Sequence, residues 1–534
     1  MTSLRTLLIG LDGATFTVLD ELVRDGVMPR LASFFARGVR APLRTIVPAL
    51  TPPAWTSLMT GRTPGHHGVF DFFRMESPED RHLRFFTSLD LKSDTIFGLA
   101  SAAGLRVTAL NYPSMFPPPR LNGYVVPGWV PWRQLRLACW PEGLMDSLKA
   151  LPGFNQRELA MDFKMEERTI EGCNDSEQFA PWIGLHTRRE RNWFEIFRHL
   201  TLEDPSDLTA VLFDGVDKLQ HLCWRFIRPR DGRPLEKDWE FQARELCLEY
   251  FRNLDNIIGE MCGIAGPEAT VLIASDHGFC ATRRIFHINA WLAERGYLKW
   301  SDAAAQWDTQ GAQIGVSQVA RHTWMIDWDH TTAFAATPTS NGLHINVARE
   351  GSAGVPANEY HAFRARLIED LLGFVDPETG KPVVTQLWTR EEVFDGPCGS
   401  VGPDLTLALE GTATVSILPA SSALSWREET AGHHHPVGVF AAAGPGIKQG
   451  AECGELSILD IAPTVLYSLG LRVPENMQGK VPTEIYERAA IASHPVLKGV
   501  AVNGAAAPDT APAALSTEDE QVILESLRDL GYIE

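Results

Sequence analysis

Four short apolar runs, each ending in a polar or glycine turn, constrain the fold of this chain more than any other feature. They are Leu7–Leu11 before Asp12-Gly13, Leu208–Phe213 before Asp214-Gly215, Thr270–Ala274 before Ser275-Asp276-His277-Gly278, and Val437–Ala443 before Gly444. Runs that are apolar throughout suit strands buried on both faces, as in a parallel sheet covered by helices. Helical patterns such as 236–262 and 456–471 alternate with them. We therefore predict an α/β fold with a doubly wound, mostly parallel sheet flanked by helices.

Two stretches break this alternation and predict the domain organisation. Residues 116–200 are rich in Trp, Pro and Arg, and residues 285–430 mix short strands with loops, so both are interpreted as insertions that cap the site. The core would then comprise residues 1–115, 201–284 and 431–488. Residues 489–534 are predicted to form a linker and a C-terminal helix that begins at a capping box, Thr517 with Glu520.

The composition of the chain argues against some classes of binding partner. The formal net charge of -19 repels polyanions, which argues against a nucleic-acid polymer or an acidic membrane surface. A small phosphorylated substrate remains compatible, because bound metal ions would supply a local cationic site. No apolar run reaches the roughly 18 residues of a membrane span. The eight cysteines are scattered, as in a reduced protein, so we expect a cytoplasmic location, and an oligomer is compatible with the sequence.

Metal-ligand residue types follow the predicted strands. Asp12 and the pair Asp276-His277 lie directly after apolar runs, at the strand ends where active residues of such sheets collect. Asp217 and His221 are four residues apart, so on a helix they could chelate one ion, although such pairs are often only surface hydrogen bonds. Asp214 competes with them in the same segment. Of the adjacent histidines 433, 434 and 435, usually one would be a ligand.

Thr51 has two interpretations. The Pro52-Pro53 pair behind it favours a helix start, so Thr51 could simply be the N-cap. Alternatively, its hydroxyl would face the positive end of the helix dipole and free N–H groups, which together form an anion site. A metal ion beside that hydroxyl would lower its pKa and make it a nucleophile.

The order of the motifs resembles the alkaline phosphatase superfamily. The matching segments are GLDGATF at 10–16, TPPAWTSLMTGRTPGHHGVFDF at 51–72, VDKLQHLCW at 216–224, ASDHGF at 274–279 and GHHHPVGVFAAAGPGI at 432–447. The sequence is most similar to the type I phosphodiesterase/nucleotide pyrophosphatase branch, and within it to a group of predicted phosphohydrolases or phosphomutases. The resemblance spans residues of about 4–485.

The resemblance implies a two-metal phosphoric ester hydrolase with Thr51 as the nucleophile. The first metal would be held by Asp217, His221 and His434, and the second by Asp12, Thr51, Asp276 and His277. Two divalent ions are implied, with Zn²⁺ expected and Mn²⁺ as the alternative. Attack of Thr51 on a phosphomono- or phosphodiester of a small organic or nucleotide substrate would give a phosphothreonine.

Other outcomes stay open at this point. The same intermediate would serve a phosphomutase or phosphotransferase, and a degenerate member would bind a phosphoester without turning it over. The absence of a Cys-x-Pro-x-Arg motif argues against a sulfatase. Phe72 stands where nucleotide pyrophosphatases carry an Asn that binds a phosphate oxygen. Another donor, such as an N–H at the start of the Thr51 helix, would have to serve.

Overall fold

The structure is a computed structural model that describes residues 4–74, 84–130, 134–159, 176–302, 304, 323–349 and 353–499. The predicted C-terminal helix lies outside these residues. Among the described helices, none combines the length and the apolar character of a membrane span. The predicted cytoplasmic location stays a prediction.

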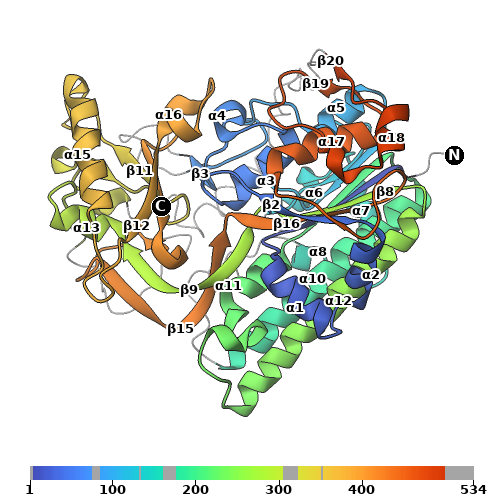
Figure 1. The fold of residues 1–534 in the computed structure, drawn as a ribbon, viewed down its shortest axis with the longest axis horizontal. Coiled ribbons are helices and arrows are strands. Elements are labelled where there is room, and N and C mark those ends of the chain that lie inside the picture. Colours follow the sequence, from blue (N-terminus) through green and yellow to red (C-terminus); the bar gives the residue numbers. More distant parts are fainter. Residues whose placement is uncertain are drawn as a thin grey trace.

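A mostly parallel sheet forms the centre of the molecule (Figure 1). Its strands in the described part of the chain are β1 (Thr6–Leu11), β2 (Val39–Arg44), β5 (Val107–Leu110), β6 (Gly123–Val126), β7 (Leu208–Phe213), β8 (Thr270–Ala274), β16 (Val437–Ala443), β17 (Ala451–Glu452) and β18 (Leu456–Ser457). The order is β17-β2-β16-β8-β1-β7-β5-β6, with β18 also paired to β2. Strand β1 pairs in parallel with both β7 and β8, whereas β16 runs antiparallel to β2 and β8. The predicted fold class is confirmed, and the four apolar runs are β1, β7, β8 and β16.

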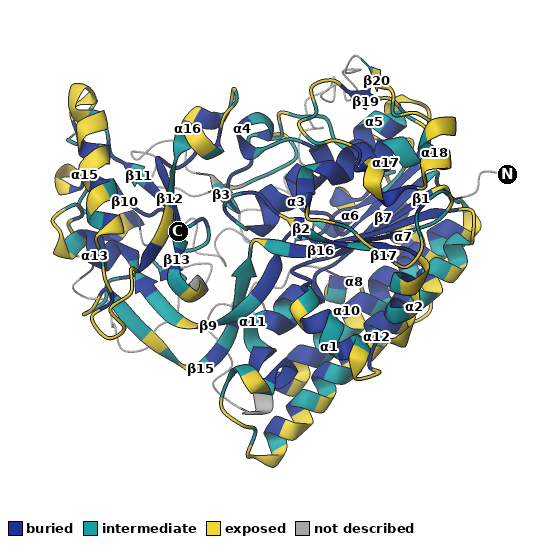
Figure 2. Ribbon diagram, viewed as in Figure 1, coloured by how far each residue is buried: buried dark blue, intermediate teal, exposed yellow. Residues whose placement is uncertain are grey.

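Helices cover both faces of this sheet. One layer contains α1 (Phe16–Arg24), α2 (Pro29–Arg37), α10 (Ser176–Glu203), α11 (Gly215–Ile227) and α12 (Asp238–Ala265), and the other contains α3 (Thr51–Thr60), α5 (Ile96–Ala102) and α17 (Ile461–Ser468). Because strand side chains alternate, Leu7 and Ile9 enter the first core and Leu8 enters the second. Figure 2 shows the strands buried between the layers, while the outer face of α12 is exposed. Strands buried on both faces explain the continuous apolar runs.

A second lobe, seen at the left of Figure 1, has its own apolar core. It contains α13 (Ile288–Glu294), β10 (Ala333–Phe334), β11 (Gly342–Ile345), α15 (Tyr360–Leu372), β12 (Val384–Thr389), α16 (Arg390–Val393) and β13 (Leu405–Leu409). A long antiparallel ribbon of β9 (Gly278–His287) and β15 (Leu424–His435), joined by β14 (Thr414–Ser416), extends from the central sheet to this lobe. The lobe lies within the predicted second insertion, 285–430.

Short elements complete the described chain. They are α4 (Pro64–His67), β3 (Phe73–Arg74), β4 (Arg84–Phe85), α6 (Leu135–Ala138), α7 (Leu144–Leu148), α8 (Gln156–Leu159), β19 (Val473–Pro474), α18 (Arg488–Ser493) and β20 (Lys498–Gly499).

Much of the predicted first insertion, 116–200, belongs to the core and is not a cap. Strand β6 is the edge strand beside β5 in the central sheet, and α10 packs against α12. Trp182 and Trp193 of α10 are fully buried in the first core. The sequence pattern did not predict the core position of β6 and α10, because β6 is only four residues long and α10 has several arginines among its apolar positions. The other predicted domain boundaries stay predictions.

Candidate active site

The central sheet brings the predicted site residues to one edge. Asp12 directly follows β1, Asp217 lies in the first turn of α11 after β7, and Asp276 follows β8. These strands are parallel, so their carboxyl ends meet at the same edge. Strand β16 is antiparallel to β8, so its beginning lies there, and His434 comes three residues before it.

The first cluster consists of Asp217, His221 and His434. Asp217 Oδ1 lies 3.4 Å from His221 Nε2 and 3.3 Å from His434 Nε2. The two Nε2 atoms are 3.0 Å apart. Asp217 and His221 share one face of α11, as their spacing predicts. Three donor atoms from a helix and a strand therefore point at one another.

The second cluster consists of Asp12, Thr51, Asp276 and His277, all buried. His277 Nε2 lies 3.2 Å from Asp276 Oδ2, 3.7 Å from Asp12 Oδ1 and 3.1 Å from Thr51 Oγ1. The clusters adjoin, because the rings of His277 and His434 stack with their centroids 3.7 Å apart. All seven predicted site residues are thus brought together.

The donor sets fit divalent cations. Within the described residues, donor atoms that could hold a metal form two groups, Asp217 with His277 and His434, and Asp12 with Asp276 and His277. His277 thus belongs to both groups, whereas His221 joins the first cluster through its contacts with Asp217 and His434. His434 Nδ1 donates to Ala49 O at 3.0 Å, and His277 Nδ1 donates to Gly278 O at 3.1 Å. A carbonyl oxygen can only accept, so in the neutral rings the Nε2 lone pairs face the carboxylates. Such an arrangement suits a cation between them.

Two carboxylate oxygens support the same conclusion. No hydrogen-bond donor within the described residues reaches Asp12 Oδ1 or Asp276 Oδ2, although both are buried. Burial raises the pKa of Asp12 well above its ordinary value, and the negative charges of Asp276 and Asp217 raise it further. Burial likewise raises the pKa of Asp276 to about 7. Buried carboxylates of this kind ordinarily pair with a cation or coordinate a metal.

Thr51 is not the N-cap that its sequence context favours. Helix α3 has Leu50 as its N-cap, and Thr51 is its first residue. Its hydroxyl lies 3.1 Å from His277 Nε2, so it is directed at the second cluster. Fewer free N–H groups than expected lie at this helix start, because Pro52 and Pro53 have no amide hydrogen and Ala54 N donates to Leu50 O. The hydroxyl, and not the helix terminus, is the distinctive feature.

Several residues that the sequence did not single out hold the clusters in place. The Phe279 ring packs against His221, His277 and His434, with centroids 4.8, 5.8 and 5.3 Å away. Trp55 Nε1 donates to Asp12 Oδ2 at 3.3 Å, one turn after Thr51 on α3. Gly13 N donates to Asp276 Oδ1 at 3.1 Å. Gly13 has φ +67°, and a Cβ there would lie 2.6 Å from the Phe279 ring, so only glycine fits.

Asp214, His433 and His435 belong to neither of the two groups of the described chain, although the His433 ring stacks on His434 with the centroids 5.5 Å apart. Asp214 is the N-cap residue of α11. The burial of Glu190, and after it the negative charge of Asp214, raises the pKa of Glu190 to about 8. His435 Nδ1 accepts a hydrogen bond from Val437 N at 3.2 Å in the turn before β16.

Phe72, at the position of the Asn of nucleotide pyrophosphatases, stacks on Trp129 with the ring centroids 5.1 Å apart. Lys218 Nζ lies 5.4 Å from the centroid of that Trp129 ring.

The fold and the site together define a class, namely α/β proteins with a candidate metal centre at the carboxyl edge of a parallel sheet. Within it, residues 6–416 match the family described as type I phosphodiesterase / nucleotide pyrophosphatase. The chain belongs to this family and is a phosphoric ester hydrolase. The predicted branch of the alkaline phosphatase superfamily is thereby confirmed.

Solved structures with a similar fold share little sequence identity with this chain. Human ectonucleotide pyrophosphatase / phosphodiesterase 5 is 12% identical, with a TM-score of 0.51 over 90% of this chain and 100% of that chain. Phosphonoacetate hydrolase from Sinorhizobium meliloti 1021, in complex with phosphonoacetate, is 14% identical, with a TM-score of 0.48 over 87% and 95% of the two chains. No curated protein matches the chain significantly in sequence.

Proposed function

We propose that this chain is a metal-dependent hydrolase of phosphomono- or phosphodiesters of a small organic or nucleotide substrate, with Thr51 as its nucleophile. The observation that carries this proposal is the buried Thr51 hydroxyl, 3.1 Å from His277 Nε2 and unused as a helix cap. A hydroxyl placed among carboxylate and imidazole ligands is suited to nucleophilic attack.

Asp217, His221 and His434 would hold one divalent ion, and Asp12, Thr51, Asp276 and His277 the other. The mixed nitrogen and oxygen donors suit Zn²⁺, with Mn²⁺ as the alternative. Bound ions lower the pKa of a coordinated hydroxyl and neutralise charge that develops on phosphoryl oxygens.

Thr51 Oγ1 gives its proton to solvent and attacks phosphorus in line with the leaving oxygen, which takes up a proton from water as it departs. The bond to the leaving group breaks as the bond to Thr51 forms, which leaves a phosphothreonine on α3. Water then hydrolyses this ester and restores the Thr51 hydroxyl. Trp55 and Gly13 keep the Asp12 and Asp276 carboxylates in register with Thr51 throughout. The fixed start of α3, set by Pro52 and Pro53, orients the nucleophile.

The first test is a hydrolysis assay with p-nitrophenyl phosphate and bis-p-nitrophenyl phosphate. We expect release of p-nitrophenol by protein loaded with Zn²⁺ or Mn²⁺, loss of that activity with a chelator, and its return when metal is restored. Hydrolysis in H₂¹⁸O should place the label in the released phosphate. Phosphate transferred to an added alcohol without label would instead identify a phosphotransferase, and no turnover of any phosphoester would contradict the proposal.

The Asp217→Ala variant tests the ligand assignment. Removing the carboxylate that contacts both His221 and His434 should lower the metal content by about one ion per chain, because only two imidazoles remain. Elemental analysis after purification without chelator measures this. Asp231→Ala is the matched control, since Asp231 lies after α11, its carboxylate accepts from Arg228 and Trp224, and it belongs to neither group of donor atoms in the described chain. An unchanged metal content in Asp217→Ala would refute the assignment.

A further inference from the structure

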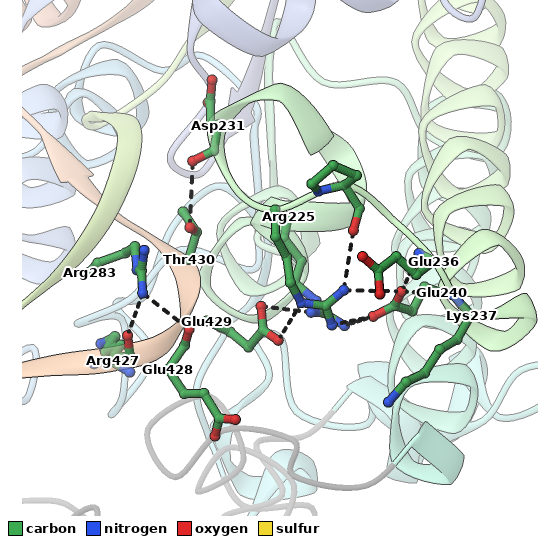
Figure 3. A network of polar contacts seen from close by, with 12 residues as sticks. Arg225, Asp231, Glu236, Lys237, Glu240, Arg283, Arg427, Glu428, Glu429 and Thr430 are labelled. Carbon is green, nitrogen blue, oxygen red and sulfur yellow. Dashed lines mark hydrogen bonds and ion pairs between the residues drawn. The ribbon is translucent and has the colours of Figure 1, made fainter.

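A network of ion pairs connects α11 to the ribbon strand β15 (Figure 3). It consists of Arg225, Arg233, Glu240 and Glu429. Arg225 contacts Glu240 Oε1 and Glu429 Oε2, each at 2.7 Å. Arg233 contacts the same two carboxylates, at 2.5 Å and 3.0 Å. None of these residues belongs to the two ligand groups.

One side of the network is rigid. The side chain of Glu240 is fully buried, and its Oε2 accepts hydrogen bonds from Glu236 N at 2.7 Å and Lys237 N at 3.0 Å at the start of α12. Although burial raises it, these bonds and the one from Arg233 hold the pKa of Glu240 at about 2. Arg225 is 7% exposed and is therefore fixed against an immobile carboxylate. Glu429, 42% exposed, is the partner that β15 contributes.

Arg225 and Glu429 each lie on the same element as one of the two histidines of the first cluster. Arg225 lies one turn after His221 on α11, and Glu429 lies five residues before His434 on β15. The β15 register against β9 shifts between Trp426 and Ala431, so Glu429 lies on a bulge that leaves the ribbon. Bulges commonly redirect a side chain beside an active site. Here the bulge directs Glu429 to α11.

The separation of the histidines depends on how β15 lies against α11. The Nε2 atoms of His221 and His434 are 3.0 Å apart, although the two residues belong to segments that are far apart in the sequence. Beyond the bulge, β15 and α11 are in close contact, because a Cβ on Gly432 would lie 2.3 Å from Gln220 O. The Arg225–Glu429 ion pair holds β15 to α11 at residue 429, before Gly432 in the sequence, whereas His434 comes after Gly432.

We propose that Arg225 and Glu429 are positioning residues that set the spacing of His221 and His434 and hence the metal affinity of the first cluster. The inference rests on the proposed function, since it takes this cluster to be a metal site. Glu429 is partly exposed, so its ion pair contributes little to global stability. Its role is geometric, because Glu429 contacts Arg225 and Arg233 and, among the described residues, no proposed ligand. We carry over to it the loss of about 10–100-fold in metal affinity that follows removal of a direct partner of a metal ligand.

The test is calorimetric titration of the metal-free full-length protein with Zn²⁺. We expect two sites in the unaltered chain, and in Glu429→Gln one site weakened about 10–100-fold while the other keeps its affinity. Glu429→Asp, which retains the charge, should recover part of the loss. The matched control is Glu428→Gln on the same strand, because Figure 3 shows the Glu428 carboxylate pointing away from Arg225. The thermal midpoint of the metal-free protein should be the same in all four proteins.

The outcomes separate this inference from the proposed function. Two Zn²⁺ sites of unchanged affinity in Glu429→Gln would overturn the positioning role and leave the proposed function intact. Equal weakening of both sites with a lowered thermal midpoint would also overturn it, since a general loss of packing would explain that result. An unaltered chain that binds no metal would overturn the proposed function and the inference with it.

Discussion

Replacing Thr51 by alanine should reduce phosphoester turnover by about 10⁴-fold or more, because loss of a covalent nucleophile leaves only binding and electrostatic contributions. The fold should persist, since the hydroxyl caps no helix and its described side-chain hydrogen bond is the one to His277. Thr51→Ser, which keeps a hydroxyl, should retain part of the activity. Steady-state kinetics and circular dichroism on the same samples measure both properties.

Thr60→Ala is the matched control for this variant. Thr60 is also buried on α3, but its hydroxyl donates to Thr56 O at 2.7 Å within the helix. The substitution removes the same atoms from the same helix without touching either cluster, so kcat should stay close to that of the unaltered protein. Near-normal activity in Thr51→Ala, or an equal loss in Thr60→Ala, would contradict the role of Thr51 as nucleophile.

The second large effect is expected for His434. His434→Ala removes a ring that contacts Asp217 and His221 and stacks on His277, so both clusters are affected. We expect the loss of about one metal ion per chain and a fall in kcat/KM of at least about 100-fold. Elemental analysis separates the loss of a ligand from a general loss of activity.

The adjacent His435 supplies the control. His435→Ala removes a hydrogen bond from Val437 N, which should cost about 0.5–1.5 kcal/mol of stability. The metal content of this variant should stay unchanged, because His435 Nδ1 accepts from Val437 N and His435 is absent from both ligand groups of the described chain. If His435→Ala lost the metal and His434→Ala retained it, the choice of ligand among the three histidines would be wrong.

The sequence predicted the parts of the site that depend on local patterns. Asp12 and Asp276 follow runs that became buried strands, and α11 displays Asp217 and His221 on one face. These features are local, because a strand end or a helical spacing depends only on neighbouring residues. His434, whose choice came from the family motif and not from spacing alone, lies in one of the two groups of donor atoms, and its role as a ligand stays a prediction.

Other features required the tertiary structure. Thr51 follows the local rule for an N-cap, yet Leu50 is the N-cap of α3 and the Thr51 hydroxyl is directed at His277, far away in the sequence. Strand β16 has the same apolar pattern as β8 but runs antiparallel to it. Burial on both faces requires apolar residues in a strand and does not set the direction in which the strand runs. The segment 116–200 contributes β6 and α10 to the core, contrary to its interpretation as a cap.

The sequence by itself therefore determined the α/β class, the buried strands and the residue types that the chain places at their ends. The family followed from the order of its motifs. Only the tertiary structure decided that Thr51 Oγ1 lies 3.1 Å from His277 Nε2, that His277 and His434 stack to join the two clusters, and that Glu429 reaches Arg225. The physical reason is that apolar periodicity encodes which side chains are buried. The distances between donor atoms, however, depend on packing between segments that are remote along the chain.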